Sequence, residues 1–217
     1  MSVAEWIIRK GEGWVALNKP AGMLVEDNPW EPDNLENLLR DYLAKSRKKP
    51  FVGIVHRLDR VTSGIILMAT KKQTLKALNE QFREKNIRKL YRARVEGIPN
   101  PPEATLRHWL ETDQQQKKAM VHQSPHPKTK EAVLHYKTVS VEANSTLLEI
   151  ELMTGRFHQI RAQLAAIGHP VAGDSKYHAT TVFYNPKGIA LQAFELSFTD
   201  PATQQAVTIR LPQTEGF

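Results

Sequence analysis

The stretch HRLDRVTSG, residues 56–64, lies between two apolar runs and decides how the rest of the chain is interpreted. The runs are FVGIV, residues 51–55, and GIILMA, residues 64–69. Both are typical of short buried strands, so the polar loop between them should stand on a rigid base. Functional side chains concentrate on loops that a scaffold holds in this way. The loop carries one carboxylate, Asp59.

The sequence neighbours of Asp59 are two cations, Arg57 and Arg60. Nearby positive charge favours the ionised form of a carboxyl group. An ionised carboxylate in a fixed position can act as a nucleophile, a base or an electrostatic stabiliser. The alternative is a surface ion-pair patch, which is worth little energetically.

The charge balance points to a polyanionic partner. Among 217 residues, 30 lysines and arginines face 23 acidic residues, a net charge of +7. Basic residues gather at 45–49 and again between positions 83 and 94, on both sides of Asp59 in sequence. Such clusters bind phosphates without reading sequence, which favours nucleic acid as the partner.

Composition also sets limits. The chain has 41% hydrophobic and 24% charged residues and no cysteine. These values are typical of a globular protein without disulfides or thiolate chemistry. No apolar run reaches the roughly 20 residues that span a bilayer, and the N-terminus does not resemble a signal peptide. We expect a cytoplasmic monomer that does not bind membranes.

Periodicity predicts three helices and several strands. Helices are expected over residues 33–45, with Asp33 or Asn34 as N-cap, over 74–85, and from 157 to Gly168. Strands are expected at 13–18, 51–55, 64–69, 90–95, 131–153 (a hairpin turning near Ala143-Asn144), 189–196 and 206–211.

Strands and helices do not alternate regularly along the chain, which predicts an α+β fold with a mixed, largely antiparallel sheet flanked by helices. Residues 100–130, rich in Pro, Gln, Lys and His, look the least ordered. We expect loops and short strands there, which serve either as a linker or as a contact to RNA.

Several motifs, taken in order, resemble those of the RluA family of pseudouridine synthases. The residues 56–64 motif resembles the family's catalytic signature, and His56 distinguishes it from the related RsuA branch, which has Gly there. Supporting segments are LNKPAGMLV (17–25), KLYRARVEG (89–97) and TGRFHQIRAQLAAIGHPVAGDSKY (154–177). LQAFELSF (191–198) matches less well, because Gln192 stands where the family usually has His.

The resemblance implies the pseudouridine synthase fold and an RNA substrate, either tRNA, ribosomal RNA or both. It implies that Asp59 is the nucleophile and that the target base is flipped out. The reaction isomerises uridine without net oxidation or reduction, so no cofactor is expected. No S4-type RNA-binding domain is expected, because the motifs begin near residue 14; residues 1–217 would form a single catalytic domain.

The resemblance also assigns a catalytic role to Tyr91, which would lie against the base, and to Arg156, which would pair with Asp59. Ile160 would help to shape the uracil pocket. Each has a plainer alternative: Tyr91 as a core aromatic residue of a strand, Arg156 as a surface or phosphate-binding residue, and Ile160 as ordinary core packing.

Arg57 is expected to assist base flipping or to contact phosphates. His56 and Thr62 are expected to shape the loop next to the substrate, as is Ser63, and Arg60 is expected to contact RNA. Lys19 and Pro20 match a motif to which we give a structural role near the cleft.

No metal is expected. His158, His169 and His178 fit no known ligand spacing and have no acidic cluster beside them. Two other functions are compatible with parts of this pattern. An RNA-binding or RNA-folding protein that keeps the fold without its chemistry would tolerate loss of Asp59, Tyr91 or Arg156, and all three are present. A hydrolytic glycosidase would need two carboxylates across a cleft, and only one stands out.

Overall fold

The computed structural model describes residues 3–212. These fold into two compact units, one formed by residues 3–89 and 193–212 and the other by residues 90–192. The first unit holds α1 (Val3–Trp6), β1 (Ile7–Gly11), β2 (Trp14–Lys19), α2 (Leu35–Ala44), β3 (Gly53–Ile54), β4 (Ser63–Ala69), α3 (Lys72–Arg83), most of β10 (Leu191–Thr199) and β11 (Ala206–Arg210).

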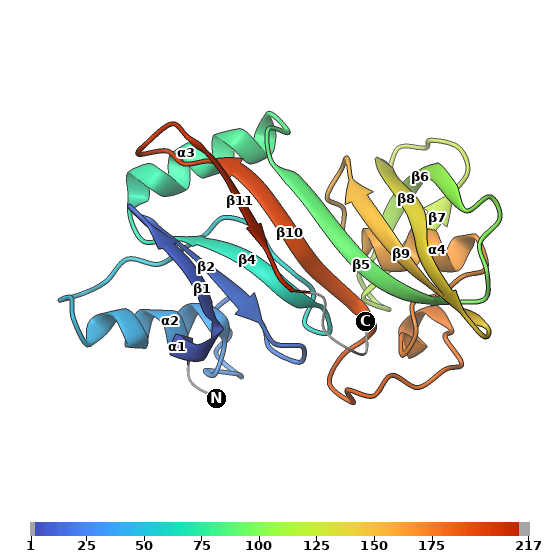
Figure 1. The fold of residues 1–217 in the computed structure, drawn as a ribbon, viewed down its shortest axis with the longest axis horizontal. Helices are drawn as coiled ribbons and strands as arrows, with labels where there is room; N and C mark the ends of the chain where they lie inside the picture. Colours follow the sequence, from blue (N-terminus) through green and yellow to red (C-terminus); the bar gives the residue numbers. More distant parts are fainter. Residues whose placement is uncertain (1–2, 213–217) are drawn as a thin grey trace. The chain divides into compact units, whose positions relative to one another are not determined.

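The strands of the first unit follow the order β1-β2-β4-β10, with β11 on β10 and β3 on β4. In Figure 1, α2 and α3 flank these strands. β4 is buried along almost its entire length, and Leu67 is fully buried in its middle. The core around it includes Trp14 and Phe198, whose rings meet edge to face 5.1 Å apart, and Leu78 of α3. Burial on this scale makes β4 a firm support for the loop that precedes it.

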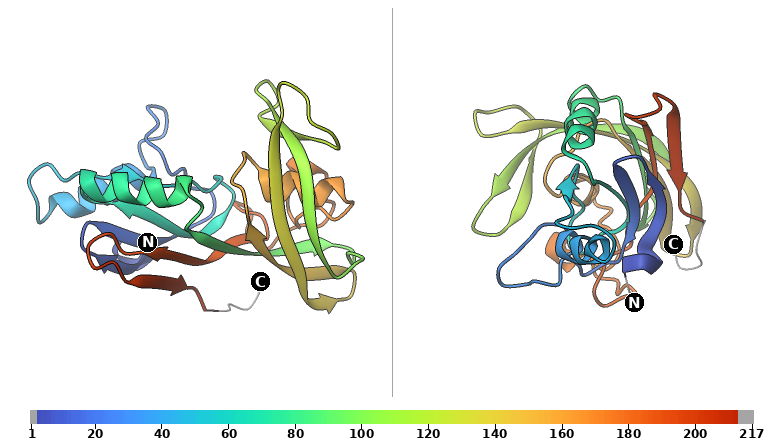
Figure 2. Two further views of the ribbon diagram at one scale, coloured as in Figure 1. Left: turned by 90° about the horizontal axis from the view of Figure 1, so that it is seen from above. Right: turned by 90° about the vertical axis from the view of Figure 1, so that its left-hand side faces the viewer.

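The second unit holds most of β5 (Arg88–Glu96), then β6 (Glu103–Asp113), β7 (Lys118–His122), β8 (Lys130–Glu142), β9 (Ser145–Leu152), α4 (Gln159–Ala166) and a 3-10 turn at Ser175–Tyr177. The strand order is β5-β9-β8-β6-β7. α4 packs on one face of this sheet, where Ala162 meets Leu110 and Ala132. Figure 2 shows α4 beside these strands.

The predicted fold class is confirmed: every described strand pairing within either unit for which a register is known is antiparallel, and helices lie against the strands. The predicted helix at 33–45 is α2, and Asn34 is its N-cap, with its side chain accepting a hydrogen bond from the Asn37 backbone at 3.0 Å. The predicted hairpin turns at Ala143, whose φ is 49°, between β8 and β9.

Two predictions were wrong in detail, and one strand was not predicted. The strand expected at 51–55 shrinks to Gly53–Ile54, which pairs with only the last two residues of β4. The helix expected from 157 begins at Gln159, because His158 takes a left-handed φ of 51°. No strand was predicted at Ile7–Gly11, where β1 pairs with β2.

The largest error concerns residues 100–130. This segment contains β6, an 11-residue strand, and β7, which pairs with it as a hairpin. β6 exposes every other residue over much of its length, so its outward face is polar. A strand buried on one face only has few apolar residues, and that composition looks like a loop.

Candidate active site

Asp59 lies in the loop between β3 and β4, in the first unit. Asp59 is partly exposed to solvent. The Asp59 carbonyl accepts a hydrogen bond from the Thr62 backbone N–H at 3.0 Å, which closes a turn directly before β4. The carboxylate is therefore presented on a short, hydrogen-bonded turn at the start of the most buried strand of this unit.

Gly64 lets the end of this turn lie close against the backbone of β10. Its φ is +116°, and a Cβ there would stand 2.2 Å from the Ala193 carbonyl oxygen. No L side chain fits that space without moving backbone. The last residue of the residues 56–64 motif is thus required by geometry and contributes no chemistry of its own.

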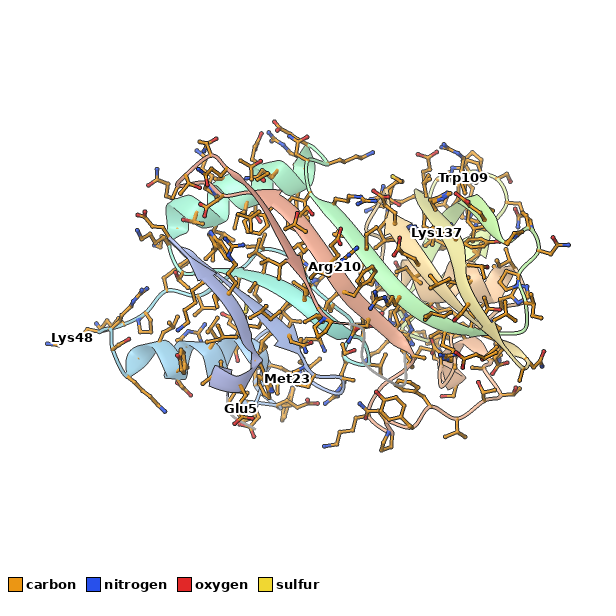
Figure 3. The ribbon with its side chains drawn as sticks, in the orientation of Figure 1. Glu5, Met23, Lys48, Trp109, Lys137 and Arg210 are labelled. Atoms are coloured by element: carbon orange, nitrogen blue, oxygen red, sulfur yellow. The ribbon has the colours of Figure 1, made fainter. Side chains whose placement is uncertain are left out.

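Lys19 connects the Asp59 loop to the segment that follows β2. It ends β2, is fully buried, and donates hydrogen bonds to the carbonyls of Pro20 (2.9 Å), Met23 (3.0 Å) and Arg60 (3.2 Å). Figure 3 labels Met23. An ammonium group has three donors, and here each one has a carbonyl acceptor.

Burial lowers the pKa of Lys19 from 10.5 to about 7, the charge of Asp59 opposes that shift, and Arg60 adds to it. A lysine with a pKa near 7 is partly neutral at pH 7, so small changes in its surroundings change its charge. The structural role expected for Lys19 is therefore combined with an electrostatic link to Asp59.

His56 connects the start of the same loop to β4 and α3. Its Nε2 accepts a hydrogen bond from the Leu67 backbone N–H at 3.0 Å, and its ring stacks on Phe82 of α3 with centroids 5.1 Å apart. Burial, followed by the charge of Lys89, lowers the pKa of His56 from 6.5 to about 3. The imidazole is neutral near pH 7 and accepts a bond rather than donating a proton.

The two arginines beside Asp59 in sequence have other acidic partners. Arg57 pairs with Glu26 at 2.7 Å, and Arg60 pairs with Glu31 while its Nε donates to the Gly22 carbonyl at 3.1 Å. Both arginines are exposed. Sequence reasoning missed both glutamates, since nothing in the sequence sets them apart from other surface acids.

Thr62 is 2% exposed, and its Oγ1 is buried without a hydrogen bond to any residue within 3–212. A buried, unpaired hydroxyl is unusual in a well-packed loop. Its proposed contact with substrate stays a prediction.

Tyr91 lies on β5 in the second unit, opposite Ile150 of β9, and is 6% exposed. This burial agrees with a tyrosine that is partly a core aromatic residue. Its predicted role against the base is not tested by these contacts.

Arg156 lies in the exposed turn before α4. Its Nε donates to the Glu131 carbonyl at 2.8 Å, and its backbone N–H donates to Oε1 of Gln159 at 3.0 Å. The same Oε1 accepts from Thr154 Oγ1 at 2.8 Å. Ile160, next along α4, is 4% exposed.

The predicted site residues therefore fall into two groups. His56, Arg57, Asp59, Arg60 and Thr62 share one loop of the first unit, whereas Tyr91, Arg156 and Ile160 belong to the second unit. The predicted ion pair of Asp59 with Arg156 would join the two groups and stays a prediction.

The three histidines for which no metal is expected have other contacts. His158 Nδ1 lies 3.0 Å from the Tyr177 hydroxyl, His169 Nδ1 lies 2.8 Å from the Glu96 carbonyl, and His178 Nε2 lies 3.2 Å from Lys118 Nζ. Within residues 3–212, a group with metal-ligand spacing occurs elsewhere, at Glu111, His122 and His126. The sequence pattern did not single out that group. Over the same residues, no helix has the length and apolar character needed to cross a membrane.

Solved structures support the fold. The chain superposes on human RNA pseudouridylate synthase domain containing 4 with a TM-score of 0.80 at 20% identity, over 98% of this chain and 90% of that one. For human RNA pseudouridylate synthase domain containing 1 the TM-score is 0.78 at 21% identity, over 95% and 82%.

Sequence comparison adds relatives and a family. A ribosomal large subunit pseudouridine synthase C from Buchnera aphidicola is 33% identical over 95% of this chain and 66% of that protein, so this chain spans slightly less than two thirds of its length. A dual-specificity RNA pseudouridine synthase RluA from Salmonella typhi is 32% identical over 95% of this chain and 92% of that protein. The family model described as RNA pseudouridylate synthase matches residues 13–166, which include Asp59, Tyr91 and Arg156. The chain belongs to the family of RNA pseudouridylate synthases.

Proposed function

We propose that this chain is an RNA pseudouridine synthase that isomerises one or more uridines of tRNA, ribosomal RNA or both, with Asp59 as the nucleophile. The observation that carries the proposal is the Asp59 loop. Its carboxylate stands on a turn that Lys19 and His56 fix from two sides, and Gly64 sets the turn tightly against the sheet. Such fixed placement of a carboxylate is what covalent or electrostatic catalysis at a sugar requires.

The proposed reaction needs no cofactor and no metal in its chemistry. The glycosidic C–N bond of the uridine breaks, the uracil turns, and its C5 bonds to C1′ of the same ribose while the C5 proton is lost and N1 gains one. Asp59 adds to the substrate or stabilises its developing positive charge. No electron acceptor or donor takes part.

Tyr91 and Arg156 are proposed as partners in this chemistry. Tyr91 would stack on the target base and help to remove the C5 proton, which its location on a buried strand allows if the base itself is enclosed. Arg156 would pair with Asp59, because a guanidinium keeps its charge and matches a carboxylate. Ile160 would line the uracil pocket beside them.

RNA is proposed to contact the exposed face of the Asp59 loop. Arg57, with a side chain that is 66% exposed, is the residue best placed to reach a phosphate or the space left by a flipped base. Arg60, His56 and Thr62 would support that contact. We propose a cytoplasmic location, since the bacterial relatives are named for ribosomal or other RNA. The monomeric state stays a prediction.

The test compares pseudouridine maps. RNA from cells that lack the gene is compared with RNA from cells that carry the wild type, Asp59→Asn or Asp41→Asn, where Asp41 is an exposed aspartate of α2. We expect the wild type and Asp41→Asn to restore the same sites. Asp59→Asn should restore none and should lose at least about 10³-fold in turnover in vitro.

Turnover and growth separate the two candidate functions, because both expect Asp59→Asn to bind RNA. If Asp59→Asn binds RNA normally and supports growth as the wild type does, the RNA-folding alternative gains. If no pseudouridine disappears when the gene is removed, the synthase proposal fails.

A further inference from the structure

The β6–β7 hairpin presents a polar face in the second unit. Trp109 of β6, which Figure 3 labels, lies directly opposite His122 of β7. Glu111 is two residues beyond Trp109 and therefore projects from the same face, diagonal to His122. Leu110 and Ala119 project from the other face and pack in the core with α4. The face that bears Glu111 and His122 is therefore the one directed away from that core.

The loop that follows β7 brings a third side chain to this face. His126 lies between Pro125 and Pro127, which restrict the backbone on both sides. Three hydrogen bonds with Thr129 fix it further: the His126 N–H donates to Oγ1 at 2.9 Å, and its carbonyl accepts from the Thr129 N–H at 2.9 Å and from Oγ1 at 2.8 Å. The imidazole is thus presented from a backbone that is already ordered.

The three side chains meet with the spacing of a coordination shell. Oε2 of Glu111 lies 3.4 Å from Nε2 of His122 and 3.5 Å from Nε2 of His126. One donor atom of each residue lies within 4.8 Å of the other two. A tetrahedral zinc ion with bonds near 2.1 Å holds its ligand atoms about 3.4 Å apart. The two separations from Glu111, 3.4 and 3.5 Å, agree with this ligand-to-ligand distance.

The environment of His122 Nε2 supplies a second indication. Its Nε2 is buried and has no hydrogen bond to any residue within 3–212. A buried ring nitrogen without a hydrogen bond is costly, and here its nearest described acceptor, Glu111 Oε2, lies 3.4 Å away; a bound cation would join the two atoms. The side chains of His122 and Glu111 are 28% and 22% exposed, so the group is sheltered but reachable from solvent.

We propose that Glu111, His122 and His126 bind one divalent transition-metal ion of the zinc type, which fastens the loop at 123–129 to the β6–β7 hairpin. Two imidazoles and one carboxylate form a ligand set that such ions accept, with a further position open to water. Its ligands include none of the residues assigned to pseudouridine formation, and the proposal gives the metal no part in that reaction.

A metal-free cluster is the competing explanation. The Lys128 backbone N–H donates to Nδ1 of His126 at 3.4 Å, which leaves the proton of a neutral ring on Nε2, facing Glu111. Metal binding has to move that proton to Nδ1 and give up this hydrogen bond. At 3.4 Å the bond is long and weak, so its loss costs little.

Metal binding is tested on the full chain, purified without a polyhistidine tag, by equilibrium dialysis with Zn²⁺ and by the visible spectrum with Co²⁺. We expect one equivalent of metal and a Co²⁺ spectrum with nitrogen and oxygen ligands. Glu111→Gln and the double variant His122→Asn/His126→Asn should each lose at least about tenfold in affinity. His135→Asn is the matched control, because His135 also pairs with a glutamate, Glu103, at 3.0 Å.

Equal affinity of the wild type and the double variant would overturn the proposal, as would absence of binding at millimolar metal. Circular dichroism shows whether each variant is folded. Protection of residues 123–129 from hydrogen exchange on addition of Zn²⁺ is the second measurement. If Zn²⁺ binds without protecting these residues, the claim that the metal fixes the loop at 123–129 to the hairpin is wrong.

Discussion

Two segments assigned to the chemistry, the Asp59 loop and the Arg156 turn, are held in place by different means. The Asp59 loop is fixed by ionisable groups that are buried, Lys19 and His56, whose pKa values both lie far below their usual ones. The Arg156 turn is fixed by neutral groups, the side-chain amide of Gln159 and the Thr154 hydroxyl. Buried ionisable groups make a support sensitive to pH and to substitution, whereas amide and hydroxyl bonds do not titrate.

The largest expected effect is on the glycine that seats the Asp59 loop. Gly64→Ala should lower the free energy of unfolding by about 4 kcal/mol, because its Cβ would overlap the Ala193 carbonyl. Gly168, after α4, also has a positive φ, +84°, but has open space around it. Gly168→Ala should cost only about 1 kcal/mol.

Urea unfolding of both variants measures this difference. Similar losses for the two would mean that backbone strain alone, and not the close approach to β10, makes glycine necessary at position 64.

The next effect compares Lys19, which supports the Asp59 loop, with Gln159, which supports the Arg156 turn. Lys19→Met removes the donors of three carbonyls and should cost about 3 kcal/mol. Gln159→Leu removes the acceptor of the Arg156 N–H and of Thr154 Oγ1, and should cost about 2 kcal/mol.

Lys71→Met serves as the control for lysine removal. Lys71 is 54% exposed and pairs with Glu12, so its loss should change stability by less than about 1 kcal/mol. A Lys19→Met protein as stable as Lys71→Met would show that the carbonyls find other donors.

The pH dependence of stability should also distinguish the two segments. The pKa of His56 is lower in the folded chain, about 3, than its usual 6.5, so the unfolded chain binds the extra proton first as pH falls. Stability from this group is complete above pH 6.5 and is lost between 6.5 and 3. At pH 5 the loss relative to pH 7.5 should be about 2 kcal/mol.

Unfolding curves at the two pH values are compared for the wild type, His56→Asn and His135→Asn. The acid loss should shrink in His56→Asn and persist in His135→Asn, because His135 pairs with Glu103 and does not contact the Asp59 loop in any hydrogen bond or ion pair described for it. An unchanged acid loss in His56→Asn would assign it to other groups.

The smallest expected effect on stability is at Arg57. Its ion pair with Glu26 joins two side chains that are 66% and 52% exposed, so Arg57→Ala should change the free energy of unfolding by less than about 0.5 kcal/mol. RNA binding should weaken, and the slope of log affinity against log salt should fall by about 1, because one phosphate contact is lost. An unchanged slope would remove Arg57 from the RNA-binding surface.

Local sequence patterns predicted much of the scaffold. The helix at 33–45, the hairpin at 143–144 and the strand after Asp59 could be predicted because apolar spacing, capping residues and turn residues act over a few positions. The hairpin at 103–122 could not be predicted in this way. Its buried face exists only because α4, far along the chain, packs against Leu110 and Ala119.

The sequence by itself determined the family, the candidate nucleophile Asp59 and the positive charge suited to RNA, since motif residues and composition are read directly from the chain. Tertiary structure decided what each charge contacts. It placed Lys19 under the loop, gave Arg57 and Arg60 to Glu26 and Glu31, and gathered Glu111, His122 and His126 at one hairpin. The pairs Lys19–Arg60, Arg57–Glu26 and Arg60–Glu31 are 29 to 41 residues apart in sequence, and the pairing of β6 with β7 brings His122 next to Glu111. Only the folded chain fixes which side chains meet across such separations.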